Sequence, residues 1–274
     1  MTHWSDRHRK NGLTLSFVPT MGFLHQGHLS LIEEGLGHAD KLVVSIFVNP
    51  TQFGPGEDFD TYPRDLERDF HLLEKIGVDA VFAPDQTDFY PQGFDTFINQ
   101  ENLPQHLCGM SRTGHFKGMM TIVAKLFNVV NPDVAVFGEK DFQQLAIIRR
   151  MAKDLNFNIR IIGHPIVREA DGLAMSSRNS KLTPAQRKTA LCLIGALKKA
   201  QNNLQNKEYR AAVLIRQAEA FIHSHPDTRI DYVKICDPGT LNDMAEIDRP
   251  VLMAMAVDIG TTRLIDNMIL NPNK

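Results

Sequence analysis

This chain has few cysteines, no long apolar run and no large excess of charge of either sign. The three cysteines, Cys108, Cys192 and Cys236, are far apart and lack the paired spacing of a zinc ribbon or a redox motif. No uninterrupted apolar stretch approaches the length of a membrane span, and residues 1–12 lack the apolar core of a signal peptide. These absences predict a protein of a reducing cytoplasm that has no membrane partner.

The charge balance argues against polymer binding as the main activity. The formal net charge is -2, and the lysines and arginines are scattered along the chain rather than clustered. Neither the basic stripe of a nucleic-acid-binding protein nor a patch for an anionic membrane is visible. With 274 residues, of which 43% are hydrophobic, the chain is long enough for one large or two modest domains.

Apolar runs alternate with helical patterns from residue 13 to about residue 166. After a first short strand at 13–18, the runs predict strands at 42–48, 78–83, 134–137 and 159–162. Apolar residues at helical spacing predict two helices between them, around 66–76 and 119–130. This alternation is typical of a parallel α/β fold, in which ligands bind beyond the carboxyl ends of the strands.

A second, smaller domain is expected after residue 166. Thr183 and Pro184 suit a helix start, since threonine can cap the helix and proline is tolerated at its first position. Helical patterns continue to about His223, and apolar runs near 230–235, 251–257 and 264–270 follow. We therefore predict two domains, residues 1–166 and residues 167–274, the second an α+β unit.

The segment from Pro19 to His28 carries the strongest functional signal. It joins a predicted strand to a predicted helix, so His25 and His28 fall at a helix N-terminus, where backbone N–H groups are unpaired. Gly22 and Gly27 allow a close approach between backbone and ligand. We predict a site for nucleotide phosphates. The alternatives are an ordinary helix start and a zinc pair, although zinc has no third ligand at a recognisable spacing.

The segment Gly138–Gln144 also follows a predicted strand and is dense in polar groups. Lys140 could hold phosphate oxygens, Asp141 a ribose hydroxyl or a magnesium ion, and Gln144 a substrate through its amide. The alternative is a charged helix start in which Gln143 and Gln144 are solvated.

A glycine-containing loop at the domain junction carries Met175-Ser176-Ser177-Arg178-Asn179. Its two hydroxyls and its guanidinium would suit a developing pyrophosphate, because arginine donates several hydrogen bonds in a fixed geometry. The alternative is an ordinary serine-rich loop.

Four further features have weaker signals. Gln52 follows the most apolar strand and can donate to a carboxylate or carbonyl, while the loop 54–62 suits either a lid or an ordinary surface loop. Asp69 lies in the next helix and is expected to be solvated. Cys108 and His115 only weakly suggest a nucleophile pair, and a core thiol and a hydrogen-bonded histidine are favoured.

Taken together, these segments resemble one family. Four motifs stand here in the order found in the pantoate-beta-alanine ligases of the HxGH nucleotidylyltransferase superfamily: Pro19–Gly22 with His25 and His28, Phe47–Phe53, Gly138–Gln144 and Asp171–Asn179. The resemblance covers nearly the whole chain. It implies a Rossmann-like, doubly wound parallel sheet that binds nucleotide and pantoate, a smaller C-terminal lid domain, and a homodimer.

The resemblance also implies a reaction. Pantoate would attack the α-phosphorus of ATP, which Mg²⁺ accompanies, to give pantoyl adenylate and pyrophosphate, and beta-alanine would then displace AMP to give pantothenate. Two rival functions are an enzyme that adenylates a phosphate ester and stops there, and a nucleotide-binding protein without turnover.

The site residues implied by the resemblance lie in all four motifs. The family's catalytic histidine corresponds to His28, and the other phosphate-side residues to His25, Lys140, Ser176, Ser177 and Arg178. Pantoate would meet the amides of Gln52 and Gln144, with beta-alanine near Gln52, and its methyl groups would meet Pro19, Met21 and Phe137. The rest of ATP would lie against Met21, Gly22, Gly138, Asp141, Val167 and Met175.

Three features depart from the family pattern. The segment before the first strand is short, and Thr113 stands where proline is usual. Against the superfamily signature Lys-Met-Ser-Lys-Ser, the loop has Ala174 and Ser177 in place of the two lysines. Lys140 and Arg178 would then supply the cations.

Overall fold

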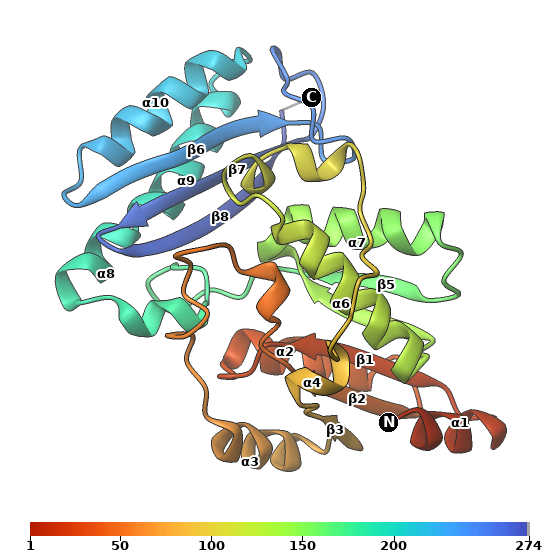
Figure 1. The fold of residues 1–274 in the computed structure, drawn as a ribbon. Coiled ribbons are helices and arrows are strands. Elements are labelled where there is room, and N and C mark those ends of the chain that lie inside the picture. Colours follow the sequence, from red (N-terminus) through yellow and green to blue (C-terminus); the bar gives the residue numbers. More distant parts are fainter. Residues whose placement is uncertain (273–274) are drawn as a thin grey trace. The chain divides into compact units, whose positions relative to one another are not determined.

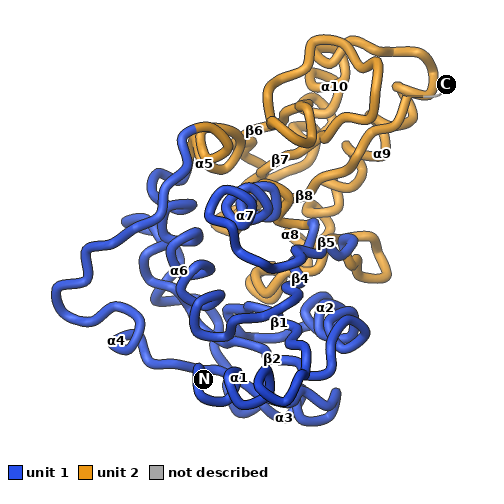
Figure 2. The backbone as a smooth tube through the Cα atoms, turned by 90° about the vertical axis from the view of Figure 1, so that its right-hand side faces the viewer, with its two compact units in different colours: residues 1–101, 112–139, 144–166 blue, residues 102–111, 140–143, 167–274 orange. Residues whose placement is uncertain are grey.

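The computed structural model describes residues 1–272, which form two compact units (Figure 2). Unit 1 consists of residues 1–101, 112–139 and 144–166, and unit 2 of residues 102–111, 140–143 and 167–274. The last passage of the chain from unit 1 to unit 2 falls between Ile166 and Val167. Two short segments that precede this point, 102–111 and 140–143, belong to unit 2.

Unit 1 is built on a parallel sheet of five strands (Figure 1). The strands are β1 (Leu15–Thr20), β2 (Lys41–Ile46), β3 (Ala80–Phe82), β4 (Val134–Gly138) and β5 (Arg160–His164). Their order in the sheet is β3-β2-β1-β4-β5, so the direction of winding reverses between β1 and β4. In open sheets of this kind, ligands bind at the carboxyl ends of the strands beside that reversal.

Helices cover both faces of this sheet. Successive residues of a strand point to opposite faces, so neighbouring residues of β1 contact different helices. Val18 of β1 lies in an apolar cluster with Ile32 of α2 (Gln26–Leu36) and Leu73 of α3 (Leu66–Ile76). Phe17, one position earlier, meets Phe127 of α6 (His115–Val130) edge to face, with ring centroids 6.5 Å apart. The remaining helices of unit 1 are α1 (Thr2–Lys10), α4 (Gln86–Phe89) and most of α7 (Phe142–Asp154).

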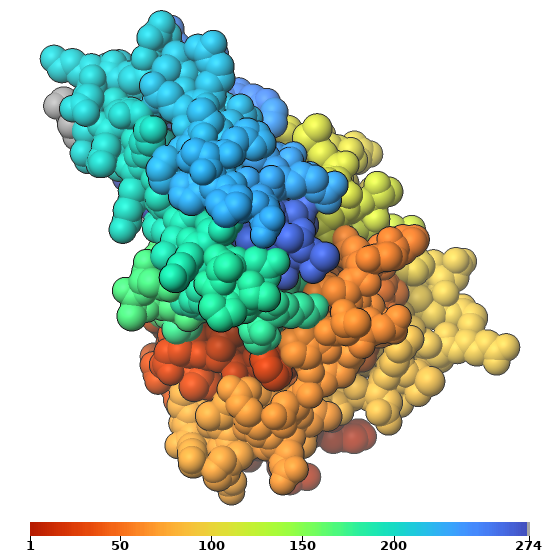
Figure 3. Space-filling view, turned by 90° about the vertical axis from the view of Figure 1, so that its left-hand side faces the viewer, coloured from red at the N-terminus to blue at the C-terminus, as the bar shows by residue number. Residues whose placement is uncertain are grey.

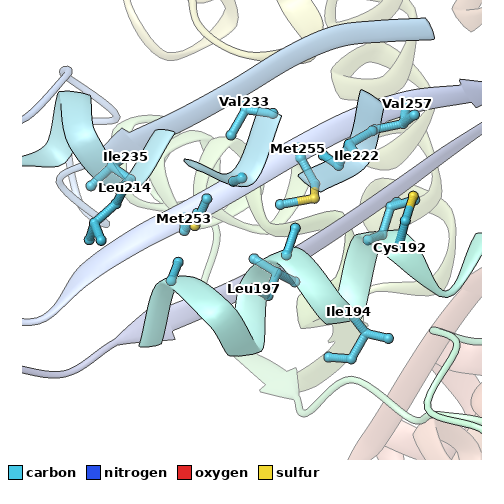
Figure 4. Close-up of a cluster of buried hydrophobic side chains, with 14 of the residues drawn as sticks. Cys192, Ile194, Leu197, Leu214, Ile222, Val233, Ile235, Met253, Met255 and Val257 are labelled. Carbon is cyan, nitrogen blue, oxygen red and sulfur yellow. The ribbon is translucent and has the colours of Figure 1, made fainter. Parts of the chain in front are cut away.

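Unit 2 is built on an antiparallel sheet in the order β6-β7-β8. Its strands are β6 (Thr228–Cys236), β7 (Val251–Ile259) and β8 (Thr262–Leu270), and its helices are α5 (Cys108–Ser111), α8 (Pro184–Ala190), α9 (Cys192–Gln205) and α10 (Ala211–His223). Met253 and Met255 of β7 pack in one apolar cluster with Leu197 of α9 and Leu214 of α10 (Figure 4).

The opposite face of the unit 2 sheet explains why two early segments belong to this unit. Leu252 and Ala254 alternate with the two methionines, and they pack in a second cluster with Leu107 from segment 102–111 and Phe142 from segment 140–143. Both faces of β7 are therefore buried, which accounts for the nearly continuous apolar sequence of this strand.

The parallel sheet, the helices on both its faces and the smaller α+β unit confirm the predicted fold class. The ends of the strands lie within two residues of the predicted ranges, and Thr183 begins α8 with the expected cap on the backbone N–H of Gln186. Helix α1, which precedes β1, had no counterpart in the sequence analysis. Among residues 1–272, none of the helices is both long enough and apolar enough to cross a membrane.

Candidate functional site

The turn that follows β1 has a conformation that favours glycine at one point. Gly22 has a φ of 79°, and a Cβ atom there would lie only 2.9 Å from Cγ2 of Ile46 and 3.1 Å from Oδ2 of Asp69. Both the backbone conformation and the available space therefore disfavour any side chain at this position. Phe23, the next residue, also has a positive φ, of 51°.

Asp69 of α3 holds this turn in place. Its Oδ2 accepts a hydrogen bond from the backbone N–H of Phe23 at 2.7 Å, and its Oδ1 accepts one from Leu24 at 2.8 Å. Arg68 donates to the carbonyl oxygen of Leu24 at 2.9 Å, and its guanidinium lies 5.4 Å from the ring centroid of Phe23. The expectation that Asp69 is solvated was wrong, because its side chain is only 1% exposed.

Burial raises the pKa of the Asp69 carboxyl, while the two backbone N–H groups and Arg68 act in the opposite direction. A buried carboxylate is stable only when donors of this kind surround it.

His25 and His28 cap the N-terminus of α2. The Nδ1 atom of His25 accepts a hydrogen bond from the backbone N–H of Gly27 at 3.1 Å, and Nδ1 of His28 accepts one from the N–H of His25 at 3.3 Å. Since each Nδ1 is an acceptor, each neutral ring carries its proton on Nε2. The two rings stack with their centroids 4.0 Å apart.

This geometry suits an anion. It places two Nε2–H donors beside the first turn of α2, where the helix dipole is positive and the backbone N–H groups face outward. Among residues 1–272, no group of three or more His, Cys, Asp and Glu side chains is arranged to hold a metal ion. The site for nucleotide phosphates stays a prediction, and the geometry of the two histidines supports it.

Gln52 ends a 3₁₀ helix, Pro50–Gln52, that follows β2, and its side chain has a defined orientation. Its Oε1 accepts a hydrogen bond from Nδ2 of Asn49 at 3.1 Å, and its Nε2 lies 3.0 Å from the sulfur of Met21. The Oδ1 of Asn49 in turn accepts from the hydroxyl of Tyr90 at 2.7 Å. The amide N–H₂ group of Gln52 therefore points toward Met21.

The start of α6 packs very closely on this 3₁₀ helix. A Cβ atom on Gly118 would overlap the carbonyl oxygen of Thr51, so only glycine fits there. The carbonyl oxygen of Gly118 accepts a hydrogen bond from Nδ2 of Asn49 at 3.1 Å. Asn49, Tyr90 and Gly118 were not predicted as site residues, because the contacts that give them a role come from distant parts of the chain.

Residues predicted from three segments of unit 1 lie at one edge of its sheet. Strands β2, β1 and β4 are adjacent and parallel, so their carboxyl ends meet there. This edge holds Pro19, Met21, Gly22, His25, His28, Gln52, Phe137 and Gly138. Gln144 also belongs to unit 1 and is half-buried in the first turn of α7. Phe137 is almost wholly buried, with 4% of its surface exposed.

The remaining predicted residues belong to unit 2: Lys140, Asp141, Val167, Met175, Ser176, Ser177 and Arg178. Gln143, in the same segment as Lys140, is not solvated as one alternative supposed. Its amide donates to the carbonyl oxygens of Leu103 and His106 at 2.9 and 2.6 Å, and so it holds segment 102–111 in unit 2.

The serine-containing loop of unit 2 is tightly built rather than an ordinary surface loop. The N–H of Met175 donates to the carbonyl oxygen of Val167 at 3.0 Å, so these two predicted nucleoside contacts are neighbours. Arg168 forms a bidentate ion pair with the buried Asp266, with N–O distances of 2.7 and 2.9 Å. The Oγ of Ser176 accepts from the N–H of Arg178 at 3.3 Å and caps the 3₁₀ helix Ser177–Lys181.

Cys108 and His115 have the structural contacts that the sequence analysis favoured over a nucleophile pair. Cys108, in unit 2, is buried, and its sulfur lies 3.2 Å from the hydroxyl of Tyr232. His115, in unit 1, has Nδ1 2.7 Å from the carbonyl oxygen of Gln52.

Comparisons with known proteins agree with the motifs. A family model described as pantoate-beta-alanine ligase matches residues 1–269. The pantothenate synthetase of Desulforapulum autotrophicum is 56% identical over 274 residues, which cover 100% of this chain and 97% of the relative. That of Desulfatibacillum aliphaticivorans is 55% identical over 268 residues, which cover 98% of this chain and 95% of the relative.

Two solved structures extend this similarity to the fold. The crystal structure of pantothenate synthetase from Thermus thermophilus has a TM-score of 0.91 and 45% identity, with 94% of each chain covered. The pantoate-beta-alanine ligase of Francisella tularensis, crystallised with beta-gamma ATP and beta-alanine, has a TM-score of 0.80 and 34% identity, with 97% of this chain and 94% of that chain covered.

Proposed function

The chain belongs to the pantoate-beta-alanine ligase family, and we propose that it condenses pantoate with beta-alanine through a pantoyl-adenylate intermediate. The carboxylate of pantoate attacks the α-phosphorus of ATP, a new P–O bond forms, and the bond to pyrophosphate breaks. The amine of beta-alanine then attacks the acyl carbon, AMP leaves with the bonding electrons, and the nitrogen loses a proton. The product is pantothenate.

The observation that carries this proposal is the placement of two kinds of group at one strand edge. His25 and His28 offer N–H donors beside a helix N-terminus, which suits phosphate oxygens. The side-chain amide of Gln52 is held by Asn49 and contacts Met21. It can therefore bind a carboxylate or hydroxyl of a substrate that also carries an apolar group. To form an acyl adenylate, the carboxylate of the acid and the α-phosphorus of ATP must be bound in neighbouring sites.

No protein nucleophile is needed, because a carboxylate is ionised at neutral pH and attacks phosphorus directly. The contribution of the protein is to align the two substrates and to stabilise the charge that develops on the phosphates. His28 would stabilise this charge together with His25 and, by family resemblance, with Lys140, Ser176, Ser177 and Arg178.

The same resemblance assigns the remaining contacts. Pantoate would donate to or accept from Gln52 and Gln144, and its methyl groups would lie against Pro19, Met21 and Phe137, with beta-alanine near Gln52. The nucleoside would lie near Gly138, Asp141, Val167 and Met175, and ATP would also contact Met21 and Gly22. The contact between Val167 and Met175 supports their assignment to one subsite.

We further propose that Mg²⁺ binds with ATP. Residues 1–272 contain no cluster of carboxylates that could form a cage for the ion, so the phosphates would supply most of its ligands, and Asp141 is the carboxylate that the motif offers. When bound, Mg²⁺ would neutralise phosphate charge. A homodimer and a cytoplasmic location complete the proposal. The homodimer rests on the family resemblance, and the location rests on the three cysteines without paired spacing.

Isotope exchange between pyrophosphate and ATP tests the first step. We expect exchange only when pantoate is present, and release of AMP with pantothenate only when beta-alanine is added. Exchange that proceeds equally well without pantoate would contradict the proposal. Binding of ATP without any turnover, with all three substrates supplied, would instead identify a nucleotide-binding protein.

A further inference from the structure

A chain of hydrogen bonds connects the loop after β2 to the backbone of Gln52. Glu57, in the loop 53–65, accepts two hydrogen bonds from Arg112, at 2.7 and 2.5 Å. Nη1 of Arg112 lies 3.0 Å from Nε2 of His115, and Nδ1 of His115 lies 2.7 Å from the carbonyl oxygen of Gln52. All four residues belong to unit 1.

The direction of each hydrogen bond follows from the chemistry of arginine. A guanidinium has donors only, so Nε2 of His115 must accept from Arg112 and cannot carry a proton. The ring proton of the neutral imidazole therefore lies on Nδ1, which donates to the carbonyl oxygen of Gln52. A second proton would place an N–H group against the guanidinium, so this contact selects the neutral ring.

Glu57 keeps Arg112 in this position. Burial alone would raise the pKa of the Glu57 carboxyl, but the hydrogen bonds and the charge of Arg112 lower it below its usual value. Glu57 is therefore ionised. Its carboxylate accepts two parallel N–H bonds from the guanidinium and so fixes the orientation of Arg112. The loop that carries Glu57 lies on the surface, in orange in Figure 3, yet the side chain of Arg112 is only 16% exposed.

The carbonyl oxygen of Gln52 needs an external donor because the 3₁₀ helix ends there. Within that short helix, the N–H of Phe53 donates to the carbonyl oxygen of Pro50, one turn earlier. His115 satisfies the carbonyl of Gln52 from one side, while Asn49 holds its side-chain amide. The backbone and the side chain of the same residue are thus fixed by separate partners.

We propose that His115 is a positioning residue for Gln52, kept in its Nδ1–H form by Arg112 and Glu57. This inference rests on the proposed function, in which Gln52 binds pantoate and lies near beta-alanine. His115 itself acts only through Gln52, and the ion pair of Glu57 with Arg112 couples the loop 53–65 to the acid-binding side of the site.

Two substitutions of similar size test which nitrogen matters. The amide nitrogen of asparagine can reach the place of Nδ1, whereas that of glutamine reaches the place of Nε2. We expect His115→Gln to raise the KM for pantoate about tenfold, the effect of leaving one buried carbonyl without its donor. His115→Asn should stay within about threefold of the wild type, because it restores that donor. The KM for ATP should change little in both.

Comparison of these two variants separates positioning from general stability, because both replace the ring by an amide. If His115→Asn raises the KM for pantoate as much as His115→Gln, or if neither raises it, the inference is overturned. An unchanged KM for ATP in both variants, whatever the difference between their thermal unfolding temperatures, would accompany the expected result.

Gln52→Ala separates this inference from the proposed function. If Gln52→Ala leaves the KM for pantoate unchanged, the role proposed for Gln52 is wrong. If Gln52→Ala raises it and His115→Gln does not, only the positioning role fails. When both roles hold, His115→Gln should add less than about twofold in the Gln52→Ala background, since residues that act through one contact are not additive.

Discussion

At the start of α2, both imidazoles keep their ring protons on Nε2 because both Nδ1 atoms accept backbone N–H groups. A donor held in this way needs no reorganisation when negative charge grows on a phosphate. In the proposed function, His28 combines two tasks, since it caps the helix with one nitrogen and would offer the other to a phosphate.

The first prediction concerns His28→Ala. It removes an N–H donor that should act most strongly in the transition state, so we expect adenylate formation to slow by about 10²-fold or more, with little change in pantoate binding. Rapid-quench measurement of the pyrophosphate burst checks this expectation. His28→Gln, whose amide can reach the place of Nε2, should recover part of the rate. An unchanged burst in His28→Ala would exclude the role.

The second prediction concerns the buried carboxylate that holds the turn before these histidines. Asp69→Asn replaces one acceptor by an N–H₂ group that faces a backbone N–H, so Phe23 or Leu24 loses its partner. We expect the KM for ATP to rise about tenfold, and faster hydrogen exchange at the amide that loses its partner, because an unpaired buried group costs about 1–3 kcal/mol.

Asp65→Ala is the matched control for Asp69→Asn. Asp65 caps α3 by accepting from the N–H of Arg68, so its loss weakens the same helix without touching the turn. We expect a loss of stability of about 1 kcal/mol and an unchanged KM for ATP. An equal rise in this KM would mean that Asp69 acts only through the stability of α3.

The buried role of Asp69 could not be predicted from its sequence neighbourhood. It stands in a charged stretch at the start of α3, where Glu67 and Arg68 precede it, and such a stretch usually faces water. Its partners are the N–H groups of residues 45 and 46 positions away in the chain. By contrast, His25 and His28 could be predicted, because helix capping is a local property that neighbouring residues determine.

At the scale of elements, the contact between α6 and the 3₁₀ helix Pro50–Gln52 depends on one residue without a side chain. The third prediction is that Gly118→Ala pushes the 3₁₀ helix away, since a Cβ atom would overlap the carbonyl oxygen of Thr51. We expect a higher KM for pantoate and a loss of about 1–3 kcal/mol in the free energy of unfolding. Denaturant unfolding and steady-state kinetics measure the two effects.

Gly37→Ala controls for the general effect of adding a methyl group to a glycine of unit 1. Gly37 has an ordinary right-handed backbone conformation, and its Cβ atom would meet only the carbonyl oxygen of Glu34, at 3.4 Å. We expect this variant to keep the wild-type KM for pantoate. A similar rise in both variants would show that the packing of α6 is not what matters.

The strands and the longer helices could be predicted because their apolar residues recur with the period of each element. The polar segments that follow β1, β2 and β4 could also be assigned to one edge, since parallel strands share their carboxyl ends. Segments 102–111 and 140–143 have no such period. Their place in unit 2 depends on Leu107 and Phe142, whose partners Leu252 and Ala254 come more than a hundred residues later.

At the scale of the whole molecule, unit 2 is not one continuous stretch of chain. Leu107 and Phe142 cover the face of its sheet that carries Cys236, which is fully buried. Burial raises the pKa of the Cys236 thiol to about 12. A fragment that begins at Val167 would have the sheet and helices α8, α9 and α10 but would lack α5 and this apolar cover.

The fourth prediction is that residues 167–274, expressed alone, expose this face. Cys192 provides an internal control, because it belongs to the other cluster, between the sheet and α9, which the fragment retains. In variants that keep only one cysteine, a disulfide reagent should modify Cys236 much faster in the fragment than in the full chain, where it is buried. Cys192, whose pKa burial raises to about 11, should react slowly in both. Equal protection of Cys236 in the fragment and in the full chain would mean that residues 102–111 and 140–143 are not needed to complete unit 2.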